Sequence, residues 1–210
     1  MLTILTPAPT QDLTAIETVK SELQLTDSAD DAVLGDLIRQ ASWTVSSHCR
    51  RVFAQETVRE TYDRFFAITC RRPILLTRTP VVQVISVTED DHVLNPSDYA
   101  ADRETGELHR MWGGYPVDWW PCRLTIDYIG GYSLLAELPH DVERCCIDLV
   151  KRYYYARSRD PSLRSEQILD VINSSYFGSS ANGGAVAGAG FPSDGLPSDI
   201  AGRLLPYRNL

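Results

Sequence analysis

The chain has 210 residues, 43% of them hydrophobic and 23% charged, and these ordinary globular values predict that most of it folds around a core. The formal net charge of -8 disfavours sequence-independent binding to nucleic acid, because neutralising phosphates requires basic residues. No apolar run approaches the roughly 20 residues that span a bilayer, and the N-terminus lacks a basic region, so we expect no membrane anchor, no signal peptide and synthesis in the cytoplasm.

The first quarter of the chain predicts an extended arm followed by two helices. Residues 1–12 form the arm. Thr14 and Glu17 fit a capping box, in which each side chain satisfies the other residue's free amide, so a short helix should start there. A longer helix should follow, because apolar residues recur at helical spacing from Leu34 to about Arg51.

Between Thr57 and Tyr132 the pattern changes to that of β-strands. Pro73 and Pro80 each precede a β-branched run and suit the start or edge of a strand. Gly106 lies between two short runs and can adopt the positive φ that a hairpin turn needs. The predicted strands lie near residues 58–62, 73–77, 80–88, 98–101, 107–110 and 123–129.

The last part of the chain predicts two helices separated by a linker. Pro139 opens a Tyr-rich amphipathic helix that should end near Ser158, and a further helical turn is expected within residues 165–172. Residues 178–195 are rich in Gly, Ala and Ser, a composition typical of a flexible linker. A short helix should follow after Leu196 and would need a surface to dock against.

These elements predict an α+β fold, with a helical bundle core, an inserted small antiparallel β module and an extended C-terminal tail. The predicted parts are an N-terminal arm at 1–12, the helical core at 13–56 and 137–176, the β module at 57–136, the linker at 177–195 and a C-terminal docking tail at 196–210.

No pattern of residues predicts catalysis. None of the four histidines lies in a metal-binding or nucleophile motif, and the five cysteines contain no Cys-x-x-Cys pair. We therefore expect buried, reduced thiols, no metal, no cofactor and no enzymatic activity. The four histidines are His48, His92, His109 and His140, and the five cysteines are Cys49, Cys70, Cys122, Cys145 and Cys146.

The stretch 111–121 gathers three tryptophans, Trp112, Trp119 and Trp120, in a turn-rich segment. They can cover the core of the β module. They can also anchor a protein interface, where Trp and Tyr are favoured. A third interpretation is a platform on which sugar rings stack.

The order of these elements resembles the head–tail connector (adaptor) family of tailed bacteriophages. The resemblance extends over most of residues 11–176 and depends on the ordered set, since no single motif is specific. The Gly-rich linker and the Trp-rich segment depart from it. The matching segments are 13–23, 30–38, Arg78-Thr79-Pro80-Val81, 94–99, Tyr128-Ile-Gly-Gly-Tyr132 and 138–157, the last being the strongest.

The resemblance implies a structural subunit that performs no chemistry. Family members form rings, often of about twelve copies with head-to-tail contacts. The ring docks on the portal protein of the capsid and receives stopper or tail proteins, while DNA passes through its channel without specific binding. Such a protein would be located in the virion neck, and in the host cytoplasm during assembly. In this interpretation the tail grips the portal through Ile200, Leu204, Leu205 and Tyr207.

Three alternatives remain open. A stopper or tail-completion protein would sit one level lower in the neck, and only the resemblance separates it from an adaptor. A carbohydrate-binding module would use Trp112, Trp119 and Trp120. A hydrolase is a distant third, without a motif of its own.

Overall fold

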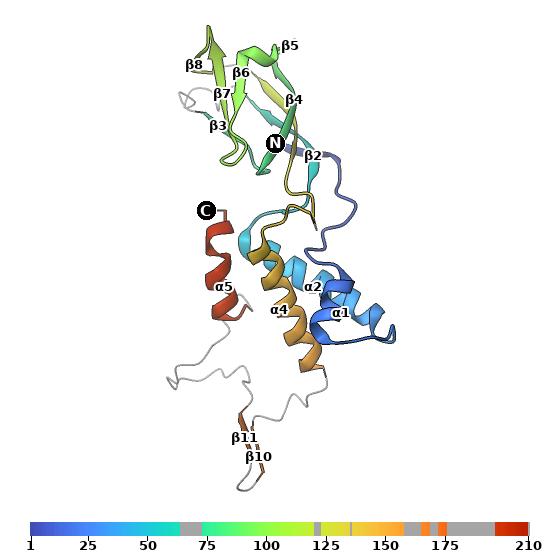
Figure 1. Ribbon diagram of the computed structural model, residues 1–210. Helices are drawn as coiled ribbons and strands as arrows, with labels where there is room; N and C mark the ends of the chain where they lie inside the picture. Colours follow the sequence, from blue (N-terminus) through green and yellow to red (C-terminus); the bar gives the residue numbers. More distant parts are fainter. Residues whose placement is uncertain are drawn as a thin grey trace. The chain divides into compact units, whose positions relative to one another are not determined.

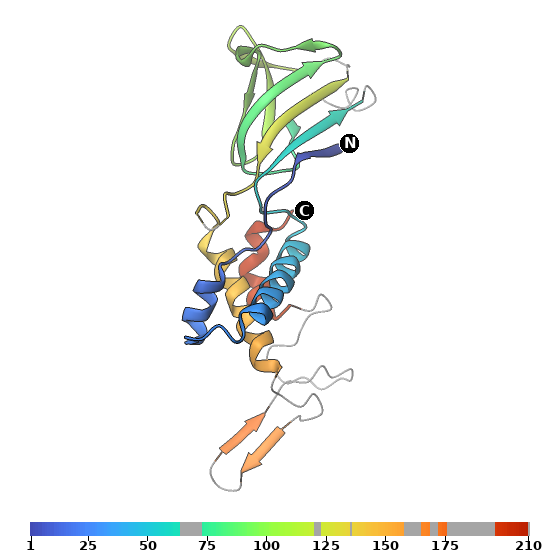
Figure 2. The same cartoon turned by 90° about the vertical axis from the view of Figure 1, so that its right-hand side faces the viewer.

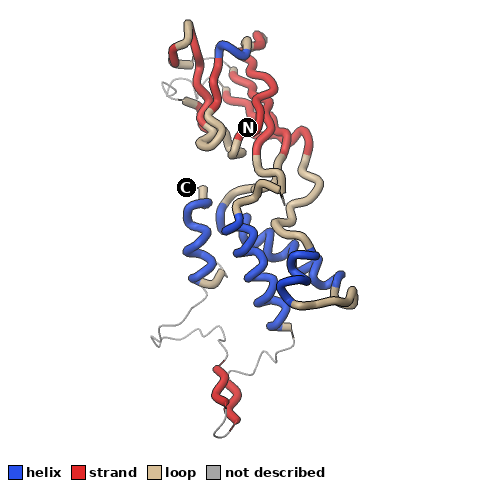
Figure 3. Tube along the Cα trace, in the orientation of Figure 1, coloured by secondary structure: helices blue, strands red, loops and turns tan. Residues whose placement is uncertain are grey.

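The computed structural model describes residues 1–63, 73–119, 123–134, 136–157, 165–168, 172–175 and 196–209. The chain divides into two compact units. We call Met1–Gln11 with Val52–Leu138 the β unit, and Asp12–Arg51 with Pro139–Leu210 the helical unit. Figure 3 shows how the two kinds of secondary structure separate: every described α-helix belongs to the helical unit, and all strands but two belong to the β unit.

The larger sheet of the β unit is antiparallel and has five strands. Figure 2 shows its middle, where β9 lies between β2 and β4. Alternate residues of β9 are buried, as a strand with one face on a core requires. The strand order is β1 (Leu2–Thr6), β2 (Glu56–Tyr62), β9 (Leu124–Gly130), β4 (Val81–Glu89) and β5 (His92–Val93).

The second sheet has four strands and shares a hydrophobic core with the first. In it, β7 pairs with β3, β6 and β8. The strands are β3 (Ile74–Leu75), β6 (Tyr99–Ala101), β7 (Glu107–Trp112) and β8 (Tyr115–Val117). The buried core residues from the two sheets and their connections are Val58, Ile74, Leu76, Val81, Val87, Leu108, Trp119, Leu124, Ile126 and Tyr128.

Glycine is required at two turns of the β unit. Gly106 has a φ of 76° between β6 and β7, which confirms the predicted hairpin. Gly131 has a φ of 105°, and a Cβ there would lie 2.4 Å from the carbonyl oxygen of Ala54. The Gly-Gly pair at the end of β9 therefore allows a close approach of two backbone segments.

The helical unit contains four described α-helices and one two-stranded hairpin. In Figure 1, α5 runs beside α4, and the two helices are in contact. Apolar residues of all four helices are buried, for example Val19 of α1, Leu34 of α2, Val142 of α4 and Leu204 of α5. The elements are α1 (Ile16–Leu23), α2 (Asp31–Cys49), α4 (His140–Ala156), α5 (Ser198–Leu204), β10 (Ser165–Ile168) and β11 (Ile172–Ser175).

The predicted fold class is wrong in its main statement. The chain has both helices and sheets, as α+β implies, but its core is not a helical bundle with a small β insertion. Nine described strands form two antiparallel sheets around their own core, and the first strand, β1, comes from the predicted arm. Periodicity located most elements, yet it could not show that distant strands complete a full unit.

Two local predictions are also wrong. The Thr14–Glu17 capping box does not form, because α1 begins after Ala15 and the Thr14 hydroxyl donates to Glu143 Oε1 at 3.3 Å. Part of the helical turn expected within residues 165–172 is instead strand β10, which pairs with β11. The predicted linker, Cys70, Cys122 and Trp120 lie outside the described residues.

None of the described helices has the length and apolar character needed to cross a bilayer.

Candidate interaction surfaces

Among the described Trp, Tyr and Phe residues, the two most exposed side chains lie at the tip of the β7–β8 hairpin. Gly113 and Gly114 have φ values of 57° and 85° and make the turn between the strands. Trp112 pairs in register with Tyr115 beside this turn. Both side chains are about three-quarters exposed, at 73% and 75%. The predicted loop is therefore a hairpin that presents two aromatic rings to solvent, as an interface would.

A hollow of about 630 Å³ lies beside this hairpin. The guanidinium of Arg110 is held in place, because it donates to Glu89 Oε1 at 3.0 Å and to the carbonyl oxygen of Asp98 at 2.7 Å. Its charge is thus already neutralised by a carboxylate. The described lining residues are Arg110, Trp112, Val117, Asp118 and Trp119.

The described tryptophans of this segment do not form a shared platform. Trp119 is only 6% exposed and belongs to the core of the β unit, where its indole N–H donates to the carbonyl oxygen of Leu108 at 3.3 Å. Of the two described tryptophans in this segment, only Trp112 is open to solvent. The core interpretation therefore holds for Trp119, while Trp112 remains available for a partner.

The predicted tail residues lie at the end of the helical unit and differ in exposure. Ile200 and Leu204 are fully buried, because their spacing places them on the face of α5 that packs on α4 and α2. Leu205 is 61% exposed and Tyr207 is half-buried. Of the four predicted portal contacts, only Leu205 and Tyr207 are accessible while α5 is docked.

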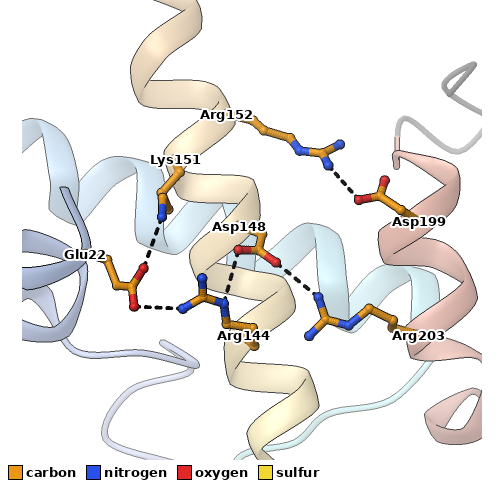
Figure 4. A network of polar contacts seen from close by, with 7 residues as sticks. All are labelled: Glu22, Arg144, Asp148, Lys151, Arg152, Asp199 and Arg203. Carbon is orange, nitrogen blue, oxygen red and sulfur yellow. Dashed lines mark hydrogen bonds and ion pairs between the residues drawn. The ribbon is translucent and has the colours of Figure 1, made fainter. Parts of the chain in front are cut away.

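Ion pairs connect α1 and α5 to α4 (Figure 4). Glu22 of α1 accepts from Arg144 at 2.7 Å and from Lys151 at 3.0 Å. These hydrogen bonds, the one from Arg144 first, lower the pKa of Glu22.

On the other side of α4, Arg203 donates to Asp148 at 3.1 Å and Arg152 donates to Asp199 at 2.6 Å, so α5 is joined to α4 at two points. Each of these side chains is a quarter or more exposed, so the pairs orient the helices and contribute little stability.

The described thiols are unsuited to nucleophilic chemistry. Cys49, Cys145 and Cys146 are buried and unpaired by disulfides, which confirms the sequence prediction for these three. Burial raises the pKa of Cys49 to about 11 and that of Cys146 to about 12. Burial raises the pKa of Cys145 as well, so all three thiols stay protonated at neutral pH. Within the described part of the chain, no group of His, Cys, Asp and Glu side chains is arranged to hold a metal ion.

Sequence reasoning missed a buried polar network inside the β unit. Glu60 is 3% exposed, and both Tyr128 and Tyr62 donate their hydroxyl protons to it at 2.5 Å. The amide of Thr77 donates to the same carboxylate at 2.9 Å. A signal was present, because Glu60 occupies an inward position of the β2 alternation. The network fixes the segment that leads into β4.

Comparisons with known proteins identify the fold. No protein family matches the chain, and no curated protein does. One similar chain belongs to the neck of an empty gene transfer agent (GTA) particle, and the structure of that neck was computed with C6 symmetry. It matches with a TM-score of 0.57 at 15% identity. A chain from the neck of the native GTA particle, computed with C12 symmetry, matches with a TM-score of 0.56 at 15% identity.

A chain from the virion of the native GTA particle matches with a TM-score of 0.59 at 16% identity. Each of these three matches covers 100% of this chain and 96% of the other. At such low identity the likeness concerns the fold, and it extends through both units. The chain therefore has the fold of a chain found in the neck of gene transfer agent particles.

Proposed function

We propose that this chain is a structural subunit of the neck of a phage-like particle. The observation that carries the proposal is the likeness to GTA neck chains over the whole chain, which includes the β unit and the helical unit together. Those neck structures have sixfold or twelvefold symmetry, so a ring of this chain follows from the same assignment.

Within the neck, we assign the chain to the adaptor ring that docks on the portal. The support is the sequence resemblance, whose ordered segments include two elements that the structure bears out, α2 and α4. A stopper or tail-completion protein is the alternative. Portal binding, a DNA channel and a copy number near twelve are parts of this assignment.

The acidic balance of the chain suits a channel wall. A net charge of -8 gives DNA no counterion-release gain, so DNA can slide past the ring without sticking. The proposal assigns the chain no chemical reaction.

The experiment that tests the assignment is electron microscopy of purified particles that carry a tagged copy of this chain. We expect density for the tag in a ring at the junction of capsid and tail. Its absence from that junction would refute the neck assignment.

A binding experiment separates adaptor from stopper. Purified chain is added to tailless, portal-bearing heads that lack every other neck protein. An adaptor binds these heads directly, whereas a stopper binds only after the adaptor has been added. Binding that requires a second neck protein would identify the chain as a stopper and not as an adaptor.

A further inference from the structure

The five-stranded sheet ends in two edges, and the β1 edge is open. Met1 and Thr61 exchange both backbone hydrogen bonds, at 2.6 and 2.8 Å. Since bonding alternates along an antiparallel pair, the amide and carbonyl groups of Leu2 and Ile4 point away from β2. No described strand pairs with this side of β1.

The sequence of β1 contains no charged, proline or glycine residue that would hinder pairing with another strand. The composition of Leu2-Thr-Ile-Leu-Thr6 favours strands. Ile4 and Leu5 are 46% and 44% exposed. A register shift between Ile4 and Thr6 bends only the end of the strand. An edge of this kind is a template for another strand, and proteins usually protect such edges.

The opposite edge of the same sheet is protected. Arg103 covers the start of β4, because its guanidinium donates to the carbonyl oxygen of Val82 at 2.9 Å and its own carbonyl accepts from Val81. β5 pairs with the other end of β4. This difference between the two edges of the sheet favours a role for the β1 edge in binding a partner strand.

We propose that the β1 edge is a site for strand addition between subunits, occupied by the β10–β11 hairpin of a second copy of this chain. The inference rests on the ring assembly proposed above. In a ring, each copy offers one surface to the neighbour on one side and a different surface to the neighbour on the other. The second copy therefore has to supply a strand edge different from β1.

The β10–β11 hairpin is the described edge that fits best. Its strands have four residues each, against two in β3 and β5 and three in β6 and β8, and β1 has five. The two strands pair only with each other in the described part of the chain. A lone two-stranded hairpin is marginally stable in water, so adding it to a sheet stabilises it.

Hydrogen exchange tests the proposal directly. The outward amide of Ile4 should exchange rapidly in the free protein and at least about 100-fold more slowly in rings isolated with the necks of particles. Amides of β10 and β11 should slow together with it. The amide of Thr3, which faces β2, is the internal control and should be protected in both states. Rapid exchange of Ile4 in the ring, or protection already in the free protein, would overturn the proposal.

Variants separate folding from assembly. Ile4→Pro removes the outward amide and leaves the bonds to β2, and Ile4→Val is the matched control that keeps the amide. Both variants should melt at the same temperature, but incorporation of Ile4→Pro into rings should fall at least tenfold. Replacing residues 165–175 with a Gly/Ser sequence of equal length should cause the same loss. Combining both changes should add nothing further, since they remove one contact.

The outcomes distinguish this inference from the function on which it depends. Wild-type rings whose Ile4 amide is unprotected, or normal assembly of Ile4→Pro, would refute strand addition alone. Failure of the wild-type chain to enter any neck ring would refute the proposed function, and this inference with it.

Discussion

The β7–β8 hairpin and helix α5 are both rich in apolar residues, and both were predicted to contact partners. The structure shows that the two elements differ in the exposure of their apolar side chains. The hairpin leaves Trp112 and Tyr115 exposed, whereas α5 buries Ile200 and Leu204 within its own unit. Apolar composition thus indicates that a surface is covered in some state, but it does not identify what covers it.

The packing around each element explains the difference. In α5, residues four apart lie on one face, and α4 and α2 complete the packing there. In the hairpin, the two glycines place Trp112 and Tyr115 next to the turn, beyond the core to which Trp119 belongs. Four measurements test this difference between buried and exposed side chains.

The largest effect is expected inside the β unit. Trp119→Ala should lower the free energy of unfolding by about 4 kcal/mol, because it leaves a cavity in the core and removes the partner of the Leu108 carbonyl. Trp112→Ala should change it by less than about 0.5 kcal/mol. Urea unfolding followed by circular dichroism measures both. Equal effects of the two substitutions would remove the contrast.

The second effect concerns α5. Leu204→Ala should lower the free energy of unfolding by about 3 kcal/mol, because Leu204 is fully buried. The matched control is its neighbour Leu205, which is 61% exposed and should tolerate alanine within about 0.5 kcal/mol. Thermal melts of the two variants compare them. If Leu204→Ala left the free energy of unfolding unchanged, α5 would not be docked in solution.

A third measurement compares polar contacts of the β unit across pH. Arg59 donates twice to Asp127, both at 2.7 Å, and this lowers the pKa of Asp127 below its ordinary value of 3.8. The contribution to stability is therefore present above that value and is lost as the pH falls through the lower, folded pKa.

Asp127→Asn should cost about 0.5–1 kcal/mol at pH 7, because Arg59 is half-exposed, and this cost should shrink as the pH is lowered below 3.8. Melting curves of the variant and the wild type across this pH range show the change. The control is Asp36→Asn, whose partner Arg39 is exposed on α2. A difference that grows toward low pH would contradict the assignment.

The smallest effect is expected at the ion pairs that join α5 to α4. Arg203→Ala should cost about 0.3 kcal/mol at low salt, because Asp148 and Arg203 are both partly exposed. The difference should disappear in about 1 M salt, where the screening length is short. A salt-independent loss would show that Arg203 acts through packing instead.

Much of the local structure could be predicted because neighbouring residues determine it. The helices α2 and α4 follow from helical spacing of apolar residues, and the hairpin at Gly106 follows from a residue that tolerates positive φ. The capping box failed for the opposite reason: Thr14 bonds to Glu143, which is 129 positions away in the chain. For Glu60, the alternation of β2 indicated burial, but its partner Tyr128 lies 68 positions away in the chain and could not be identified from the sequence.

Sequence patterns alone located most of the described helices and strands and indicated that the described cysteines are buried, and the residue counts set the net charge of -8. Three features depend on tertiary packing: the strands form a unit with its own core, Trp119 is buried while Trp112 is exposed, and α5 packs on its own unit. The physical reason is that periodicity and propensity act over a few residues, whereas burial depends on surfaces brought together from distant parts of the chain.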